Sequence, residues 1–237
     1  MIGVWDYTVI LTYCSIVSAC AGILVSLEDT GHPYIGMLFL MICGLCDTFD
    51  GRVARSKKNR TDIGKAFGVQ IDSLSDLVAF GVLPVCIGVA YYRADIHVLL
   101  PNQEVQGILT KLPVGIIVAF SAIFVLFALI RLAWFNVTVE ETQGEGVKEK
   151  YYVGLPVTST ALIFPSFLII DYILRYTTRV NISFVYYIIL IVVAILFVMK
   201  FKLKKPGSAI IYLMVGFGAI EFFIIIGMKI LEYYGII

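Results

Sequence analysis

The feature that most constrains this sequence is a series of apolar runs, each long enough to cross a lipid bilayer as a helix. About 20 apolar residues span the hydrocarbon core, and such windows fall at 7–27, 34–55, 67–93, 112–136, 155–175, 182–203 and 208–234. The 237 residues are 60% hydrophobic and 15% charged, whereas soluble proteins have about 25% charged residues. The sequence therefore predicts an all-α fold, a polytopic transmembrane helix bundle of six to seven spans with seven favoured, formed by residues 1–237 as a single domain.

The basic residues indicate which ends of these spans face the cytoplasm. With a cytoplasmic N-terminus, thirteen of the 18 Lys and Arg residues fall on the inner side. The other five are Arg93, Lys111, Arg175, Arg179 and Lys229. Because cytoplasmic loops carry an excess of positive charge, we expect an integral protein of the cytoplasmic membrane. The first apolar run lacks the basic start and cleavage site of a signal peptide, and no basic tract with interleaved aromatics indicates nucleic-acid binding.

Four aspartates lie in the second and third predicted spans, where a charge at the bilayer centre costs roughly 2.5–3.5 kcal/mol. Asp47 and Asp50 are three residues apart on one helix, and Asp72 and Asp76 share one face of the next. On antiparallel neighbours, these carboxylates would lie at one membrane depth and repel each other. Oxygen ligands without His or Cys favour Mg²⁺, Mn²⁺ or Ca²⁺, and two such ions can clamp a phosphoryl group. We therefore expect an active site at the cytoplasmic end of spans 2 and 3.

Small residues beside the aspartates leave room for a ligand near the backbone. Gly51 and Ala54 lie on or next to the face that carries Asp47 and Asp50, and Gly68 lies one turn before Asp72. Arg55 follows one turn after Gly51 and suits a phosphate oxygen. This set indicates a substrate with a diphosphate. The alternative interpretation is a group of helix-end aspartates that neutralise nearby Lys and Arg side chains.

The spacing of these residues resembles the signature of the CDP-alcohol phosphotransferases. Members of that family are integral membrane enzymes that move a phosphatidyl or related group from a CDP-linked donor to an alcohol and release CMP. The matching residues are Asp47, Asp50, Gly51, Ala54, Arg55, Gly68, Asp72 and Asp76. The family usually has eight residues between the Arg and the second Gly, whereas this chain has the twelve of 56–67. We expect the extra four to lengthen a loop, which costs little free energy.

The resemblance also implies roles for these residues. Asp47, Asp50 and Asp72 would bind two Mg²⁺ or Mn²⁺ ions, and Asp76 would be both a ligand of the second ion and the base that takes the proton of the acceptor hydroxyl. The residues expected to receive the CDP moiety are Asp50, Gly51, Ala54, Arg55 and Gly68. The family also suggests a homodimer.

Three further stretches resemble the phosphatidylserine synthase branch of the family: IDSLSDLVAFGVLP (71–84), RLAWFNV (131–137) and GLPVTS (154–159). The resemblance implies CDP-diacylglycerol as the donor and L-serine as the acceptor. Arg131 could bind the serine carboxylate or a lipid phosphate, or could snorkel at a helix end, and Asn136 is a second candidate for that pocket. Phosphatidylglycerophosphate and inositol-type synthases are the alternatives within the family.

Two other hypotheses concern the membrane-buried carboxylates. A cation transporter or channel could use aspartates as a pathway, but transporter sites usually lie near the membrane midplane, and these aspartates lie at one end, beside basic residues. Glu221 lies deep in the last apolar run, where a carboxylate is a functional candidate. We favour a helix–helix or dimer contact for Glu221 over a catalytic role.

Overall fold

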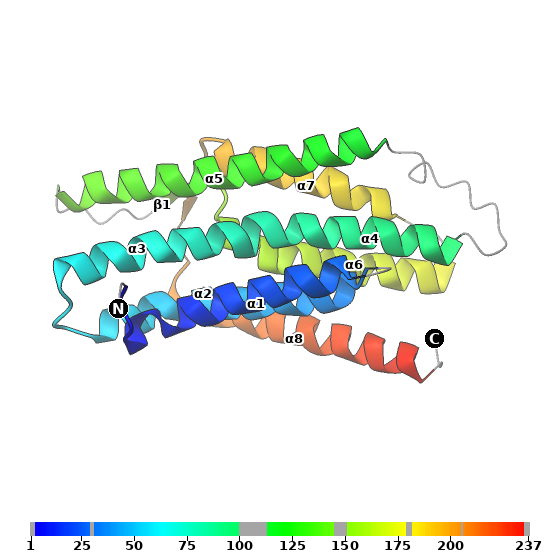
Figure 1. The fold of residues 1–237 in the computed structure, drawn as a ribbon, viewed down its shortest axis with the longest axis horizontal. Helices are drawn as coiled ribbons and strands as arrows, with labels where there is room; N and C mark the ends of the chain where they lie inside the picture. Colours follow the sequence, from blue (N-terminus) through cyan, green and yellow to red (C-terminus); the bar gives the residue numbers. More distant parts are fainter. Residues whose placement is uncertain are drawn as a thin grey trace.

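The computed structural model describes residues 3–28, 31–99, 113–144, 151–178, 182–204 and 206–234. Its helices lie side by side along one long axis and form a bundle (Figure 1). They are α1 Ile10–Leu27, α2 Pro33–Ser56, α3 Asp62–Asp76, α4 Leu83–Leu99, α5 Val114–Gly144, α6 Thr160–Thr178, α7 Ser183–Val198 and α8 Ser208–Tyr233. A π-helical segment, Leu77–Val82, joins α3 to α4 without a break, and short 3₁₀ turns at Tyr7–Val9 and Val157–Ser159 precede α1 and α6.

The helices confirm a polytopic membrane protein. Within the described residues, six helical segments are long and apolar enough to cross a membrane: Tyr7–Leu27, Pro33–Ser56, Asp62–Arg93, Val114–Thr138, Val157–Thr178 and Ser208–Leu231. The span predicted at 182–203 is a shorter helix, because α7 has 16 residues and the chain enters a strand after it. That length is below the roughly 20 residues that cross the hydrocarbon core.

Two helices are longer than the apolar windows predicted. Helix α3, where the third predicted span starts, begins at Asp62 and not at residue 67. Thr61 caps this helix, because its side chain accepts a 3.1 Å hydrogen bond from the Gly64 N–H. Helix α5 continues to Gly144, past its predicted end at residue 136. Both extensions are polar, so a search for apolar residues cannot detect them. Figure 1 shows that these ends of α3 and α5, with the end of α2, project beyond the end of α7 and the start of α8.

A two-stranded antiparallel sheet is the exception to the predicted all-helical fold. Strands β1 Tyr151–Val153 and β2 Lys202–Lys204 pair, with Tyr152 opposite Leu203. Three residues are too few for an alternating pattern to be recognised in sequence. The sheet ties the chain before α6 to the chain between α7 and α8.

Aromatic side chains fill the core between α4, α6 and α7. Tyr186 of α7 is fully buried, and its ring centroid lies 4.9 Å from that of Phe164 on α6. Its hydroxyl donates a 2.6 Å hydrogen bond to the Pro84 carbonyl, and the Tyr187 hydroxyl donates to the Gly88 carbonyl, both on α4. These bonds satisfy two buried hydroxyls and fix α7 against α4.

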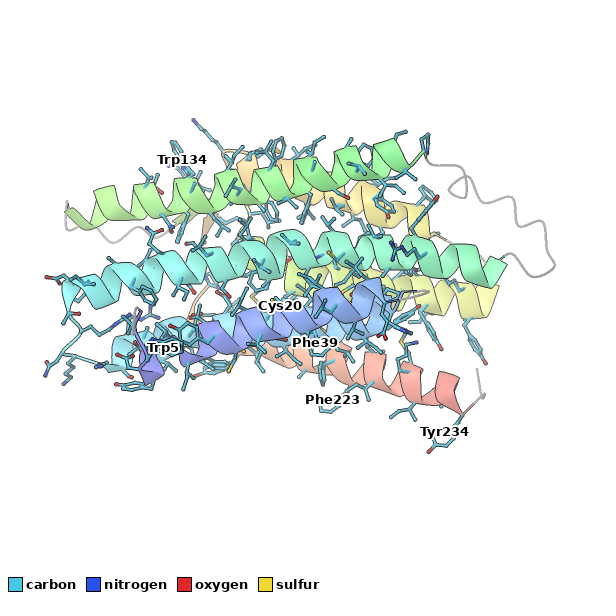
Figure 2. All side chains as sticks on the ribbon, viewed as in Figure 1. Trp5, Cys20, Phe39, Trp134, Phe223 and Tyr234 are labelled. Carbon is cyan, nitrogen blue, oxygen red and sulfur yellow. The ribbon has the colours of Figure 1, made fainter. Side chains whose placement is uncertain are left out.

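Helix α8 presents apolar side chains away from the bundle. Figure 2 shows Phe223 and Tyr234 pointing outward, and Leu213 is also largely exposed. A helix whose outward face is apolar and exposed suits contact with lipid tails. The long axis of the bundle is therefore the direction in which the chain crosses the membrane.

Candidate active site

Three of the four predicted aspartates come together between the second half of α2 and the second half of α3. Carboxylate oxygens of Asp47, Asp50 and Asp72 all lie within 4.8 Å of one another. Helices α2 and α3 run in opposite directions and are joined by a short turn, so the end of one lies beside the start of the other (Figure 1). Asp50 is buried, and Asp47 and Asp72 are half-buried. The two helices thus hold three hard oxygen ligands at one level, as the spacing predicted.

Asp76 lies one turn further along α3 and is not a member of this close group. Its side chain is buried, and the charges of Asp47, Asp72 and Asp50 act on its carboxyl group. The π-helical segment begins at the next residue, Leu77. Single turns of π-helix are frequent at functional sites, and this one directly follows the innermost aspartate of the site.

Among the residues that the structure describes, no Lys or Arg forms a salt bridge with any of the four aspartates. In the described part of the chain, the salt bridges join Lys57 to Asp6, Lys65 to Asp62 and Arg175 to Asp171. Buried carboxylates without a paired charge are costly, and the nearby basic side chains do not neutralise this group. A divalent cation with oxygen ligands fits such a site. The donor set suits Mg²⁺, Mn²⁺ or Ca²⁺ better than a metal that prefers sulfur or imidazole.

The two predicted glycines lie under arginine side chains. A Cβ atom on Gly51 would lie 3.3 Å from Nη1 of Arg55, and one on Gly68 would lie 2.5 Å from Nη2 of Arg60. A guanidinium therefore lies over bare backbone on each helix. Ala54 is half-buried on α2, and Arg55 is exposed. Arg60 was not among the predicted site residues, because nothing in the stretch SKKNRTDIGKAF distinguishes it from its basic neighbours.

The stretch 56–67 is not the simple loop that we expected. Residues from Asp62 onward belong to α3, so the second half of this stretch is helical. Lys57 forms a 2.7 Å ion pair with Asp6, before α1. Hydrogen bonds from Lys57 and Thr8 hold the pKa of the half-buried Asp6 carboxyl well below its usual range. The stretch is therefore fixed at both ends by contacts that its sequence pattern did not reveal.

The two acceptor candidates lie on α5. Arg131 is only 6% exposed, its Nε donates a 3.1 Å hydrogen bond to the Leu155 carbonyl, and its guanidinium lies 5.3 Å from the Phe135 ring centroid. Arg131 is thus buried in the protein and does not snorkel to water. The Asn136 side-chain amide donates a 2.8 Å hydrogen bond to the Ser73 hydroxyl, next to Asp72. Asn136 therefore contacts α3 at the level of the aspartates.

Glu221 lies away from this site, on α8. It is buried, and its Oε1 is hydrogen-bonded to the Ser166 hydroxyl on α6. Its Oε2 has no hydrogen-bond partner among the described residues. This geometry is the helix–helix contact that we favoured for Glu221.

Comparison with known proteins identifies one family over most of the chain. The family model described as CDP-alcohol phosphatidyltransferase matches residues 7–199. That range contains every residue of the site described above except Asp6. No solved structure matches the chain.

Relatives with assigned activities are similar to somewhat more than half of the sequence. The CDP-diacylglycerol–serine O-phosphatidyltransferase of Saccharomyces cerevisiae is 38% identical over 136 residues, which is 55% of this chain and 41% of the relative. The enzyme of the same name from Helicobacter pylori is 28% identical over 60% of this chain and 49% of the relative. The archaetidylserine synthase of Methanothermobacter thermautotrophicus is 30% identical over 65% of this chain and 54% of the relative. The chain thus spans about half the length of these relatives or less.

Proposed function

Since the chain belongs to the CDP-alcohol phosphatidyltransferase family, we propose that it transfers the phosphatidyl group of CDP-diacylglycerol to L-serine, giving phosphatidylserine and CMP. The names of two of the relatives give serine as the group that receives the phosphatidyl group, and the name of the third gives archaetidylserine as its product. The observation that carries the proposal is the group formed by Asp47, Asp50 and Asp72, whose carboxylate oxygens lie within 4.8 Å of one another and form no salt bridge within the described part of the chain.

Divalent metal is a general requirement of the family, and this aspartate group could hold it. We propose two ions, Mg²⁺ or Mn²⁺, held by Asp47, Asp50 and Asp72, with Asp76 completing the ligands of the second ion. When bound, such ions withdraw charge from the diphosphate and stabilise the departing CMP. No further role is needed from them for the steps described next.

Asp76 is the proposed base. A serine hydroxyl is a weak nucleophile until a positioned group shares its proton. As the serine oxygen bonds to the phosphorus that carries diacylglycerol, Asp76 takes the hydroxyl proton. The bond from that phosphorus to the bridging oxygen breaks, and CMP leaves with the electron pair. The place of Asp76, one turn deeper along α3 than Asp72, suits a base on the side remote from the nucleotide.

The donor and acceptor are proposed to occupy different walls of the site. Asp50, Gly51, Ala54, Arg55 and Gly68 receive the CDP moiety, because the two glycines leave open backbone beside the aspartates. On the opposite wall, α5 supplies Arg131 for the serine carboxylate or a lipid phosphate. Asn136 belongs to the same wall through its contact with Ser73.

We also propose that the protein lies in the cytoplasmic membrane and that its active site faces the cytoplasm. The α2–α3 turn carries Lys57, Lys58 and Arg60, which is the charge expected of a cytoplasmic loop. Serine would enter from the cytosol, and the lipid donor from the inner leaflet. As in the family, we propose a homodimer in which residues 1–237 act as one catalytic domain.

The test is an acceptor screen with the purified protein and CDP-diacylglycerol. Serine should give phosphatidylserine and release CMP, whereas glycerol 3-phosphate and inositol should not. A product formed with either of those acceptors alone would assign the chain to another activity of the family. No CMP release with any acceptor, together with cation flux in vesicles, would favour the transporter hypothesis instead.

A further inference from the structure

Arg60 lies over Gly68 although it is outside the family signature. A Cβ on Gly68 would meet Arg60 Nη2 at 2.5 Å, Cζ at 3.6 Å and Nη1 at 3.8 Å, so most of the guanidinium faces this glycine. A single 2.9 Å hydrogen bond, from Nη2 to the Gly64 carbonyl, holds it there. A larger residue at position 68 would displace the guanidinium.

The positive charge of Arg60 is not paired with a carboxylate among the described residues. Asp62, two residues after Arg60, pairs with Lys65, and Asp6 pairs with Lys57 of the same turn. An arginine held in place without a counter-charge is suited to an anionic ligand.

Arg60 and Arg55 occupy matching places on the two helices. Arg55 lies over Gly51, one turn beyond Asp47, and Arg60 lies over Gly68, one turn before Asp72. Because α2 and α3 are antiparallel, Gly51 is displaced from Asp47, and Gly68 from Asp72, toward the same end of the bundle, by about 6 Å along each axis. A diphosphate that extends outward from the aspartates would meet a guanidinium on each side.

Building on the proposed function, we propose that Arg60 is a second diphosphate-binding residue, which contacts the CDP-linked donor from α3 while Arg55 contacts it from α2. The stretch 56–67, which is four residues longer than the usual family spacing, would thus supply a ligand contact. The planar guanidinium can give two parallel N–H···O bonds to phosphate oxygens. To bind phosphate, the guanidinium either gives up its hydrogen bond to the Gly64 carbonyl or keeps that bond through one of its nitrogens.

Neighbouring basic residues provide matched controls. Arg52 points elsewhere, because its Nη1 donates to the Tyr212 hydroxyl on α8 and its guanidinium lies 5.3 Å from that ring. Lys58 lies in the same turn as Arg60 and is exposed. Lys58→Gln therefore makes the same charge change as Arg60→Gln at almost the same place.

The experiment is calorimetric titration of CDP into purified protein in a neutral detergent with Mg²⁺ present, for the wild type, Arg60→Gln, Arg60→Lys and Lys58→Gln. We expect Arg60→Gln to weaken CDP binding about 10- to 100-fold, as for the loss of a charged hydrogen bond. Arg60→Lys keeps the positive charge but cannot give two parallel N–H···O bonds, so it should bind CDP with intermediate affinity. Lys58→Gln should bind like the wild type, and all four proteins should melt at similar temperatures without CDP.

Two results would overturn the proposal. One is that Arg60→Gln binds CDP with the affinity of the wild type. This includes the case in which Arg60→Gln keeps its CDP affinity but loses affinity for vesicles with anionic headgroups. The other is a loss of CDP affinity in Lys58→Gln as large as the loss in Arg60→Gln, which would show only a general effect of positive charge. If Arg60→Gln does not fold, Arg60→Lys decides by the same comparison. A wild-type protein that binds no CDP would contradict the proposed function itself, which separates the two failures.

Discussion

The side-chain amide of Asn136 on α5 donates a 2.8 Å hydrogen bond to the hydroxyl of Ser73 on α3. Ser73 follows Asp72 directly, so this bond holds α3 against α5 at the level of the aspartate group. The proposed acceptor wall and the proposed metal ligands are therefore connected through one polar contact. A change on α5 can alter the position of the aspartates without touching them.

Removal of the Asn136–Ser73 bond should affect turnover more than acceptor binding. We expect Asn136→Ala to lower kcat about 2- to 10-fold, since a neutral hydrogen bond contributes roughly 0.5–1.5 kcal/mol. Ser73→Ala removes the same bond from the other side and should have the same effect, and the double variant should be no worse than either single one. A rise in the KM for serine that is confined to Asn136→Ala would instead indicate direct acceptor contact.

Chelation of divalent ions should abolish CMP release, and Mg²⁺ or Mn²⁺ should restore it. Asp47→Asn and Asp72→Asn each remove one of three clustered ligands. Loss of a residue that supports a metal ligand typically lowers metal affinity about 10- to 100-fold. We expect loss of a ligand itself, in either variant, to raise the metal concentration for half-maximal activity by at least this factor. Asp62→Asn is the control, because that exposed residue pairs with Lys65 on the same helix. Full CMP release in excess chelator would contradict the metal site.

Arg131→Lys should raise the KM for serine and leave CDP affinity unchanged. The substitution keeps the charge but loses the planar fork that suits a carboxylate. Because Arg131 also bonds to the Leu155 carbonyl before α6, the melting temperature must be measured beside the kinetics. A fall in melting temperature with an unchanged KM for serine would reduce Arg131 to a structural role.

Glu221→Gln should leave CMP release close to the wild type, since the amide can keep the bond to Ser166. Replacing both partners, as in Glu221→Leu with Ser166→Ala, should be nearly neutral or stabilising, because it removes the unpaired buried Oε2. The measurements are melting temperature and CMP release for both variants. Loss of turnover in a folded Glu221→Gln protein would assign Glu221 a catalytic role.

The sequence predicted the parts of the fold that hydropathy controls. Apolar windows located the helices, and the spacing of Asp47, Asp50 and Asp72 predicted that their carboxylates meet. Helix that continues into polar sequence was missed, at the start of α3 and at the end of α5, because helical hydrogen bonds need no apolar side chains. The pairing of β1 with β2 was missed because it joins strands far apart in sequence.

Arg60 shows the limit of this reasoning at the site. Its position over Gly68 depends on the path of the α2–α3 turn and on the extra helical turns that begin at Asp62. Neither is fixed by a local pattern. The family spacing suggested that the additional residues were only a longer connection, whereas their contacts place a guanidinium beside the proposed nucleotide site.

The role of Asp76 as the base is the central claim of the mechanism. Loss of a general base typically lowers the rate about 10²–10⁴-fold. Asp76→Asn should therefore depress kcat by at least that factor, and by more if a metal ion is lost with it. Donor binding should suffer less than in Asp47→Asn or Asp50→Asn, because the proposed donor contacts Asp50, Gly51, Ala54 and Arg55 lie on α2.

The most direct measurement is single-turnover CMP release beside CDP-diacylglycerol binding, for Asp→Asn variants at positions 47, 50, 72 and 76. The mechanism predicts that the Asp76 variant retains donor binding and loses the chemical step, while the Asp47 and Asp50 variants lose both. Near-normal turnover in Asp76→Asn, or a failure explained entirely by lost donor binding, would contradict the assignment of Asp76 as the base.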